Sequence, residues 1–210
     1  VSVAGTTELG EMDPIHEVQQ VLDDFREQHG WHIWHHVDAA YGGFLCAMDA
    51  EGSDVVSENM TQALAAIGEA NSTTVDPHKW GYVPYASGAF ICRQKREYYY
   101  RKSIAPYINF QGARERGPQT IEGSRSAAGA ISTWLTSRTI GLSHEGYGRI
   151  IERTIRSRIK LEELLRQAHP SIRIFPNAET NIITFCVARE NEAMGKTNER
   201  TMKVYKAFSP

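Results

Sequence analysis

Two ionisable side chains of this sequence lie in segments suited to chemistry with an aldehyde. Lys79 stands in the run Asp76-Pro77-His78-Lys79-Trp80, and Asp38 follows an apolar stretch that ends at Val37. A neutral lysine amine adds to an aldehyde to give a Schiff base. A carboxylate facing a pyridine ring nitrogen keeps that nitrogen protonated, so the ring can take up an electron pair. A lone lysine is usually a solvated surface charge and a lone aspartate is often a cap or turn residue, so the two are informative only together.

Two small residues are further candidates for this site. Ala40 precedes the Tyr41-Gly42-Gly43 turn, and its methyl group could pack against a ring face that a larger side chain would block. A small residue before a tight turn is the alternative explanation. Thr6 follows Gly5 at a strand end, where its hydroxyl could reach a ring oxygen or a carboxylate, or could simply cap the turn.

The order of four motifs resembles one enzyme family. Gly5-Thr6-Thr7, Asp38-Ala39-Ala40-Tyr41-Gly42-Gly43, Pro77-His78-Lys79 and Gly123-Ser124-Arg125 follow one another as in the group II pyridoxal phosphate (PLP)-dependent amino-acid decarboxylases. This family includes aromatic amino-acid, tyrosine, glutamate and histidine decarboxylases. The resemblance implies an α/β fold of the aspartate aminotransferase type (fold type I), PLP as cofactor and an L-amino acid, aromatic or acidic, as substrate. It also implies a Schiff base on Lys79 and a cofactor site that includes Asp38, Ala40, Thr6, His78 and Ser124.

Two of these assignments need further argument. The resemblance places the Lys79 turn beside the cofactor phosphate, and many relatives have asparagine where this chain has Asp76. An anionic Asp76 would repel phosphate unless it points away, so we assign His78 and not Asp76 to the cofactor. Ser124 could meet a phosphate or carboxylate at a helix start, but capping and a structural ion pair of Arg125 explain the motif equally well.

Tyr107 bears on the reaction type. It lies in residues 104–112, where the family carries a mobile loop whose tyrosine protonates the carbanion after carbon dioxide leaves. A phenol can act in this way as a general acid if the closed loop excludes water. Packing is the usual role of a lone tyrosine, and phenylalanine at this position would indicate the oxidative, aldehyde-forming relatives.

The composition is that of an ordinary soluble protein. The 210 residues are 41% hydrophobic and 23% charged, and a formal net charge of -2 gives no reason to expect nucleic acid or a membrane as partner. Three cysteines without CxxC spacing indicate reduced thiols and a cytoplasmic protein. His29, His32, His35 and His36 suggest a metal cluster, but on a strand His35 faces away from His32 and His36, and no acidic residue or cysteine completes a ligand set. We therefore predict no metal site.

The hydrophobic pattern predicts alternating strands and helices. We expect strands at residues 1–4, 32–37, 72–75, 87–92, 172–175 and 181–187. We expect helices at residues 14–29, 61–69, 94–102, 124–140 and 145–167, the first capped by Asp13 and closed by Gly30. Ligands in such sheets bind at the carboxyl ends of strands, where Thr6, Asp38 and Lys79 would lie.

The resemblance also sets the expected organisation. Residues 1–145 should be the C-terminal part of the PLP-binding large domain, and residues 146–210 the connecting helix and the start of a small domain. Family members are about twice this length and are usually homodimers with shared active sites. We therefore expect the chain to hold only part of a site. Two alternatives remain open: another fold-type-I PLP lyase, or an inactive fragment that lacks the N-terminal half of the site.

Overall fold

The computed structural model describes residues 1–101 and 125–208. Its elements follow in the order β1 (Ser2–Val3), α1 (Ile15–His29), β2 (His36–Asp38), η1 (Gly42–Ala47), α2 (Glu58–Ala66), η2 (Ile67–Glu69), β3 (Ser72–Val75), β4 (Ala89–Cys92), η3 (Lys95–Arg101), α3 (Ala128–Ile140), η5 (His144–Gly148), α4 (Arg149–Ala168), β5 (Ile172–Ile174), β6 (Phe185–Val187) and α5 (Met194–Phe208). Of the short helices, η1, η2 and η3 are 3-10 helices and η5 is a π-helix.

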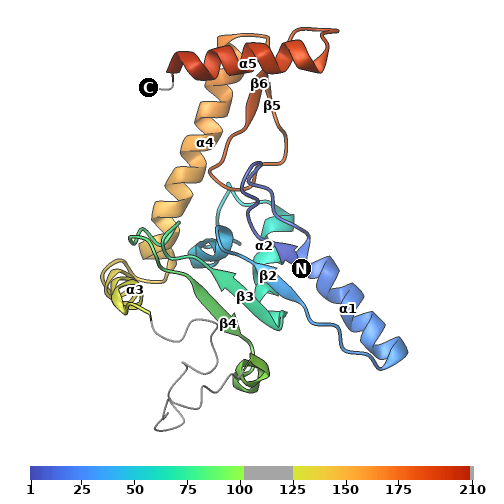
Figure 1. Cartoon of the computed structure of the whole chain (residues 1–210), viewed down its shortest axis with the longest axis vertical. Coiled ribbons are helices and arrows are strands. Elements are labelled where there is room, and N and C mark those ends of the chain that lie inside the picture. The colour runs from blue at the N-terminus through green and yellow to red at the C-terminus, as the bar shows by residue number, and fades with distance from the viewer. Residues whose placement is uncertain (102–124, 209–210) are drawn as a thin grey trace.

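A four-stranded sheet in the order β1-β2-β3-β4 lies at the centre of the lower part of the molecule (Figure 1). β1, β2 and β3 run parallel, and β4 is antiparallel to β3. Parallel neighbours need a crossover connection, which α1 supplies between β1 and β2 and α2 supplies between β2 and β3. This arrangement confirms the predicted α/β class.

The two faces of the sheet have different environments. Val37 is fully buried, whereas His36 and Asp38 on either side of it are half-buried, because successive side chains of a strand point to opposite faces. The register places Asp38 beside Thr74 and Thr74 beside Phe90, so these side chains share the face that is not buried in the core. Asp38 therefore lies opposite to Val37, as expected.

The hydrophobic core lies against the Val37 face. It combines residues of α1, α2, β2 and the start of α4, among them Ile15, Met60, Ile151 and Ile155, all at 0% exposure. This core contains residues on both sides of the expected boundary between residues 1–145 and 146–210, and that boundary stays a prediction.

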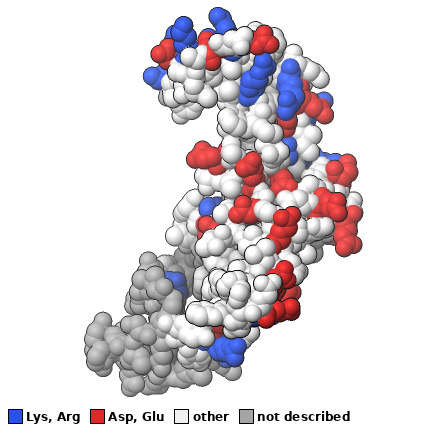
Figure 2. Space-filling view, turned by 90° about the vertical axis from the view of Figure 1, so that its right-hand side faces the viewer, with Lys and Arg blue, Asp and Glu red and all other residues white. Residues whose placement is uncertain are grey.

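The long helix α4 leaves the core and leads to a second, smaller unit. There β5 and β6 form an antiparallel pair, and α5 packs against β6 (Figure 1). Figure 2 shows Lys and Arg gathered mainly at this end and Asp and Glu over the middle of the visible face. No helix in residues 1–101 or 125–208 is long and apolar enough to cross a membrane.

The start of α1 differs from the prediction. The helix begins at Ile15 with Pro14 as its N-cap, and no side chain caps it. Asp13 was expected to cap the helix, but its carboxylate accepts a hydrogen bond from the backbone N–H of Val3 at 2.7 Å. The predicted end is confirmed, because Gly30 adopts a left-handed conformation and its N–H donates to the carbonyl of Arg26.

Other boundaries shift for local reasons. α2 begins at Glu58, earlier than expected, because the Ser57 hydroxyl caps it by accepting a hydrogen bond from the N–H of Met60 at 3.0 Å. β2 keeps only His36 and Val37 of the strand predicted at residues 32–37 and extends to Asp38. β6 occupies only the C-terminal end of the strand predicted at residues 181–187. The helix expected at residues 94–102 is the 3-10 helix η3, and α4 begins after the π-helical turn η5.

Candidate functional site

The Lys79 turn is hydrogen-bonded to the segment that follows the neighbouring strand β2. β3 ends at Val75, and the backbone N–H of Asp76 then donates to the carbonyl of Ala40 at 3.1 Å. The N–H of Lys79 donates to the carbonyl of Asp76 at 3.0 Å, which closes the turn. Because β2 and β3 are parallel neighbours, these bonds bring the Lys79 turn and the end of β2 together at the carboxyl edge of the sheet.

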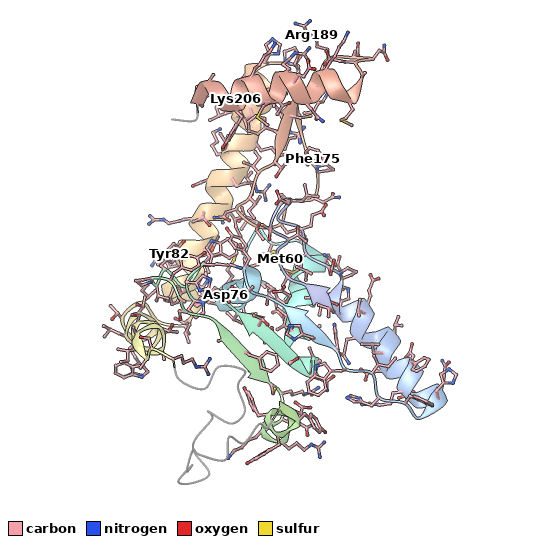
Figure 3. The ribbon with its side chains drawn as sticks, viewed as in Figure 1. Met60, Asp76, Tyr82, Phe175, Arg189 and Lys206 are labelled. Atoms are coloured by element: carbon pink, nitrogen blue, oxygen red, sulfur yellow. The ribbon has the colours of Figure 1, made fainter. Side chains whose placement is uncertain are left out.

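The Lys79 amine is held by a carboxylate. Its Nζ lies 3.0 Å from Oδ2 of Asp76, and the Lys79 and Asp76 side chains are 32% and 17% exposed. The amine is thus reachable from solvent but not free in it, and the contact is an ion pair. Figure 3 shows Asp76 and Tyr82 at this end of the sheet, far from Arg189 and Lys206. Sequence reasoning gave Asp76 no place in the site, although its position three residues before Lys79 in a turn was a usable signal.

His78 lies on the other side of Asp76. Its Nε2 is 3.5 Å from Oδ2 of Asp76, and its Nδ1 accepts a hydrogen bond from the backbone N–H of Ser87 at 3.1 Å. The imidazole stacks on the ring of Tyr85, with centroids 4.0 Å apart. The imidazole and the Lys79 amine therefore both lie against one carboxylate oxygen.

One carboxylate oxygen of Asp38 accepts a hydrogen bond, and the other is available as an acceptor. Its Oδ1 accepts a hydrogen bond from the N–H of Ala40 at 3.0 Å. Its Oδ2 has no hydrogen-bond partner among the residues that the structure describes. Ala40 is half-buried beside it and carries only a methyl group. The end of β2 thus presents a carboxylate oxygen that can accept a hydrogen bond from a cationic ring N–H.

Thr6 takes part in a local turn. Its hydroxyl oxygen accepts a hydrogen bond from the N–H of Glu11 at 3.0 Å, and its own N–H donates to the carbonyl of Glu11 at 2.9 Å. These contacts are the turn capping that the sequence left open, although the hydroxyl hydrogen can still be donated elsewhere. The other two candidates, Tyr107 and Ser124, lie outside the described residues.

Aromatic residues that the sequence did not single out support the Lys79 turn. Trp80, 3% exposed, stacks on the ring of Tyr41 with centroids 4.6 Å apart, and the Tyr41 hydroxyl donates to the side chain of Asn181 at 2.5 Å. The hydroxyl of Tyr147 donates to the carbonyl of Gly81 at 2.7 Å. Burial raises the pKa of both Tyr41 and Tyr147, so both phenols stay protonated donors. Tyr41 and Trp80 could have been found from the sequence, because Tyr41 lies in the Asp38 motif and Trp80 directly follows Lys79.

The histidines near β2 have protein partners. His35 bonds to the hydroxyl of Ser2 and the side-chain oxygen of Gln19, at 2.9 and 2.8 Å. His36, on the opposite face, bonds to two hydroxyls of β3, and its ring stacks on Phe90. Within the described part of the chain, no group of three His, Cys, Asp or Glu side chains could hold a metal ion.

The family profile and the relatives found by comparison with known proteins indicate the same family. The profile described as the pyridoxal-dependent decarboxylase conserved domain matches residues 1–188. An L-tyrosine decarboxylase from Enterococcus faecium is 30% identical over 198 residues, covering 82% of this chain and 32% of the relative. A probable L-tyrosine/L-aspartate decarboxylase from Methanothermobacter thermautotrophicus is 33% identical over 187 residues, covering 88% of this chain and 46% of the relative. The chain thus spans less than half the length of these curated relatives.

Solved structures agree with the fold. The apo form of mouse CSAD has a TM-score of 0.74 at 21% identity, covering 98% of this chain and 40% of that chain. Catharanthus roseus tryptophan decarboxylase in complex with L-tryptophan has a TM-score of 0.69 at 19% identity, covering 98% and 39%. These likenesses confirm the predicted fold type.

Proposed function

The chain belongs to the pyridoxal-dependent decarboxylase family, and from this premise we propose that it carries the lysine-bearing part of the active site of an amino-acid decarboxylase. The reaction is removal of the α-carboxylate of an L-amino acid as carbon dioxide, with PLP as cofactor. The observation that supports this most strongly is the Lys79 amine, held by Asp76 at the same sheet edge as Asp38.

The residues of this edge fit PLP. PLP supplies an aldehyde for an amine and a protonated ring that takes up the electron pair left by departing carbon dioxide. Lys79 offers a partly exposed amine, and Asp38 offers the carboxylate oxygen that lacks a partner among described residues. Ala40 leaves room for a ring where a larger side chain would intrude, and His78 and the hydroxyl hydrogen of Thr6 are the proposed polar contacts.

Two further roles rest on the resemblance. We assign Tyr107 as the donor of the proton that replaces the carboxylate at the α-carbon, and we place Ser124 beside the cofactor. The substrate class is aromatic or acidic L-amino acids, because the relatives above are named L-tyrosine and L-tyrosine/L-aspartate decarboxylases. We further propose a cytoplasmic homodimer with shared active sites, in which parts beyond this chain complete the substrate pocket.

Carbon dioxide release tests the proposal. The protein is supplied with PLP and with L-tyrosine, L-aspartate or L-glutamate, and carbon dioxide and the matching amine are measured. We expect turnover of at least one of the three and its loss in Lys79→Ala. Lys160→Ala is the matched control, because this exposed lysine pairs with a carboxylate three residues away, as Lys79 does. Undiminished turnover in Lys79→Ala would contradict the proposal. Loss of amino acid without carbon dioxide would indicate another PLP lyase, and no reaction would indicate an inactive fragment.

A further inference from the structure

We propose that helix α3 positions His78 through Ser87 and Thr133, so that the imidazole presents its Nε2–H to Asp76, the carboxylate that also holds the Lys79 amine. The protonation pattern of the imidazole follows from hydrogen bonding alone. The importance of this His78 orientation for holding PLP at Lys79 rests on the proposed function.

The contact with Ser87 fixes which ring nitrogen carries the proton. The backbone N–H of Ser87 points at Nδ1 of His78, at an N–N distance of 3.1 Å. A backbone N–H can only donate, so Nδ1 must be the acceptor, and a neutral imidazole then carries its proton on Nε2. Nε2 lies on the Asp76 side, 3.5 Å from Oδ2. Stacking on Tyr85 holds the ring plane in this orientation.

Ser87 is in turn held by α3. Its hydroxyl lies 3.2 Å from the carbonyl of Gly129 and 2.8 Å from the hydroxyl of Thr133. With Ser87 donating to the carbonyl, Thr133 donates to Ser87, and both bonds are satisfied. Ser87 is only 7% exposed, so this contact is sheltered from water. The backbone N–H that orients His78 therefore belongs to a residue whose side chain is fixed by α3.

The close approach of α3 depends on Gly129. A Cβ atom at this position would lie 2.3 Å from the carbonyl oxygen of Ala86, well inside contact distance. No residue of α3 is itself buried, and Ile131, Trp134 and Leu135 are 62%, 65% and 57% exposed. Because α3 buries so little of itself against the described residues, the Ser87–Thr133–Gly129 contact has a large influence on where the helix lies.

The experiment combines a spectroscopic and a chemical readout in the same protein. Nitrogen NMR of ¹⁵N-histidine-labelled protein reports which nitrogen of His78 is protonated. Borohydride reduction in the presence of PLP, followed by peptide mass spectrometry, reports the rate at which the cofactor is attached to Lys79. Thr133→Val removes one hydroxyl at constant shape, and Ser87→Ala keeps the backbone N–H but loses the hydroxyl. Thr139→Val is the matched control, because the Thr139 hydroxyl is exposed and, among the residues that the structure describes, bonds only to the carbonyl of Leu135 within α3.

We expect wild-type His78 to be protonated on Nε2. In Thr133→Val and Ser87→Ala we expect a mixture of the two neutral forms and attachment to Lys79 slowed about two- to tenfold, the range supported by one hydrogen bond. Gly129→Ala should have a larger effect and Thr139→Val none. Circular dichroism identifies any variant that fails to fold, and the two hydroxyl variants then remain as the test.

Two results would overturn the inference. One is a wild-type His78 protonated on Nδ1. The other is an unchanged His78 spectrum with unchanged attachment in both Thr133→Val and Ser87→Ala. A wild-type protein that attaches no PLP at Lys79 but shows the expected Nε2–H signal would overturn the proposed function and leave the positioning of His78 intact.

Discussion

The contact between the loop around Gly10 and the segment before β6 can be measured with two matched glycine substitutions. Gly10 and Gly30 have nearly the same left-handed backbone conformation, with φ of +67° and +71°. A Cβ on Gly10 would lie 2.3 Å from the hydroxyl oxygen of Thr180 and 3.0 Å from Cβ of Ile182, whereas a Cβ on Gly30 has no neighbour within 4 Å. Comparing the stability of Gly10→Ala with that of Gly30→Ala therefore separates the effect of backbone strain from that of steric conflict.

The expected magnitudes follow from these surroundings. An alanine in the left-handed region costs about 1–2 kcal/mol, and both variants bear this penalty. Gly10→Ala also forces apart two well-packed segments, which adds about 1–3 kcal/mol. Thr180 has little freedom to move, because it is fully buried and its N–H donates to the carbonyl of Gly10 at 3.1 Å. Gly10→Ala should thus lower the free energy of unfolding by about 2–5 kcal/mol and Gly30→Ala by about 1–2 kcal/mol.

Urea unfolding followed by circular dichroism measures both values. We expect the urea midpoint for Gly10→Ala to fall well below that for Gly30→Ala. Thr180→Ser keeps the hydroxyl bonds of this residue and should not relieve the conflict, whereas Thr180→Gly should relieve part of it. Equal loss of stability in Gly10→Ala and Gly30→Ala would refute the packing of these two segments.

Three further predictions concern single side chains. Burial lowers the pKa of His35 from its ordinary 6.5, so the unfolded chain binds a proton below about pH 6.5 that the folded chain does not, and stability should fall as the pH decreases. Urea unfolding at about pH 7.5 and about pH 5.5 measures this fall in the free energy of unfolding. In His35→Asn the fall should be smaller than in the wild type by at most about 1.4 kcal/mol per pH unit. Equal falls in the two proteins would contradict the prediction. Tyr147→Phe leaves the Gly81 carbonyl without its bond and should lower the free energy of unfolding by about 1–3 kcal/mol, which an unchanged urea midpoint would disprove. Asp38→Asn should lower the decarboxylation rate about 10²-fold or more, while Asp24→Asn on the exposed side of α1 should not.

The sequence was informative where chemistry and local pattern coincide. Lys79 and Asp38 each follow a short β-favouring stretch, so their placement at neighbouring strand ends could be predicted from the α/β pattern. Gly30 was predictable as the end of α1, because a left-handed C-terminal residue favours glycine. Asp13 was misassigned, because its partner is the backbone N–H of Val3 in a different element.

The supporting contacts of the site were beyond sequence reasoning. Ser87 meets Thr133 across 46 residues, and Tyr41 meets Asn181 across 140 residues. No periodicity or local propensity reports such pairs, because they arise only when distant segments pack. Asp76 illustrates a related limit: its charge could be read from the sequence, but the direction of its carboxylate is set by the turn geometry.

Identification of the lysine that attaches PLP tests directly whether Lys79 is the cofactor lysine. The protein is incubated with PLP, reduced with borohydride, digested, and its peptides are analysed by mass spectrometry, with Lys79→Arg treated in parallel. We expect a reduced cofactor adduct on Lys79 in the wild type and its absence in Lys79→Arg. An unmodified Lys79 alongside adducts on other lysines would contradict it.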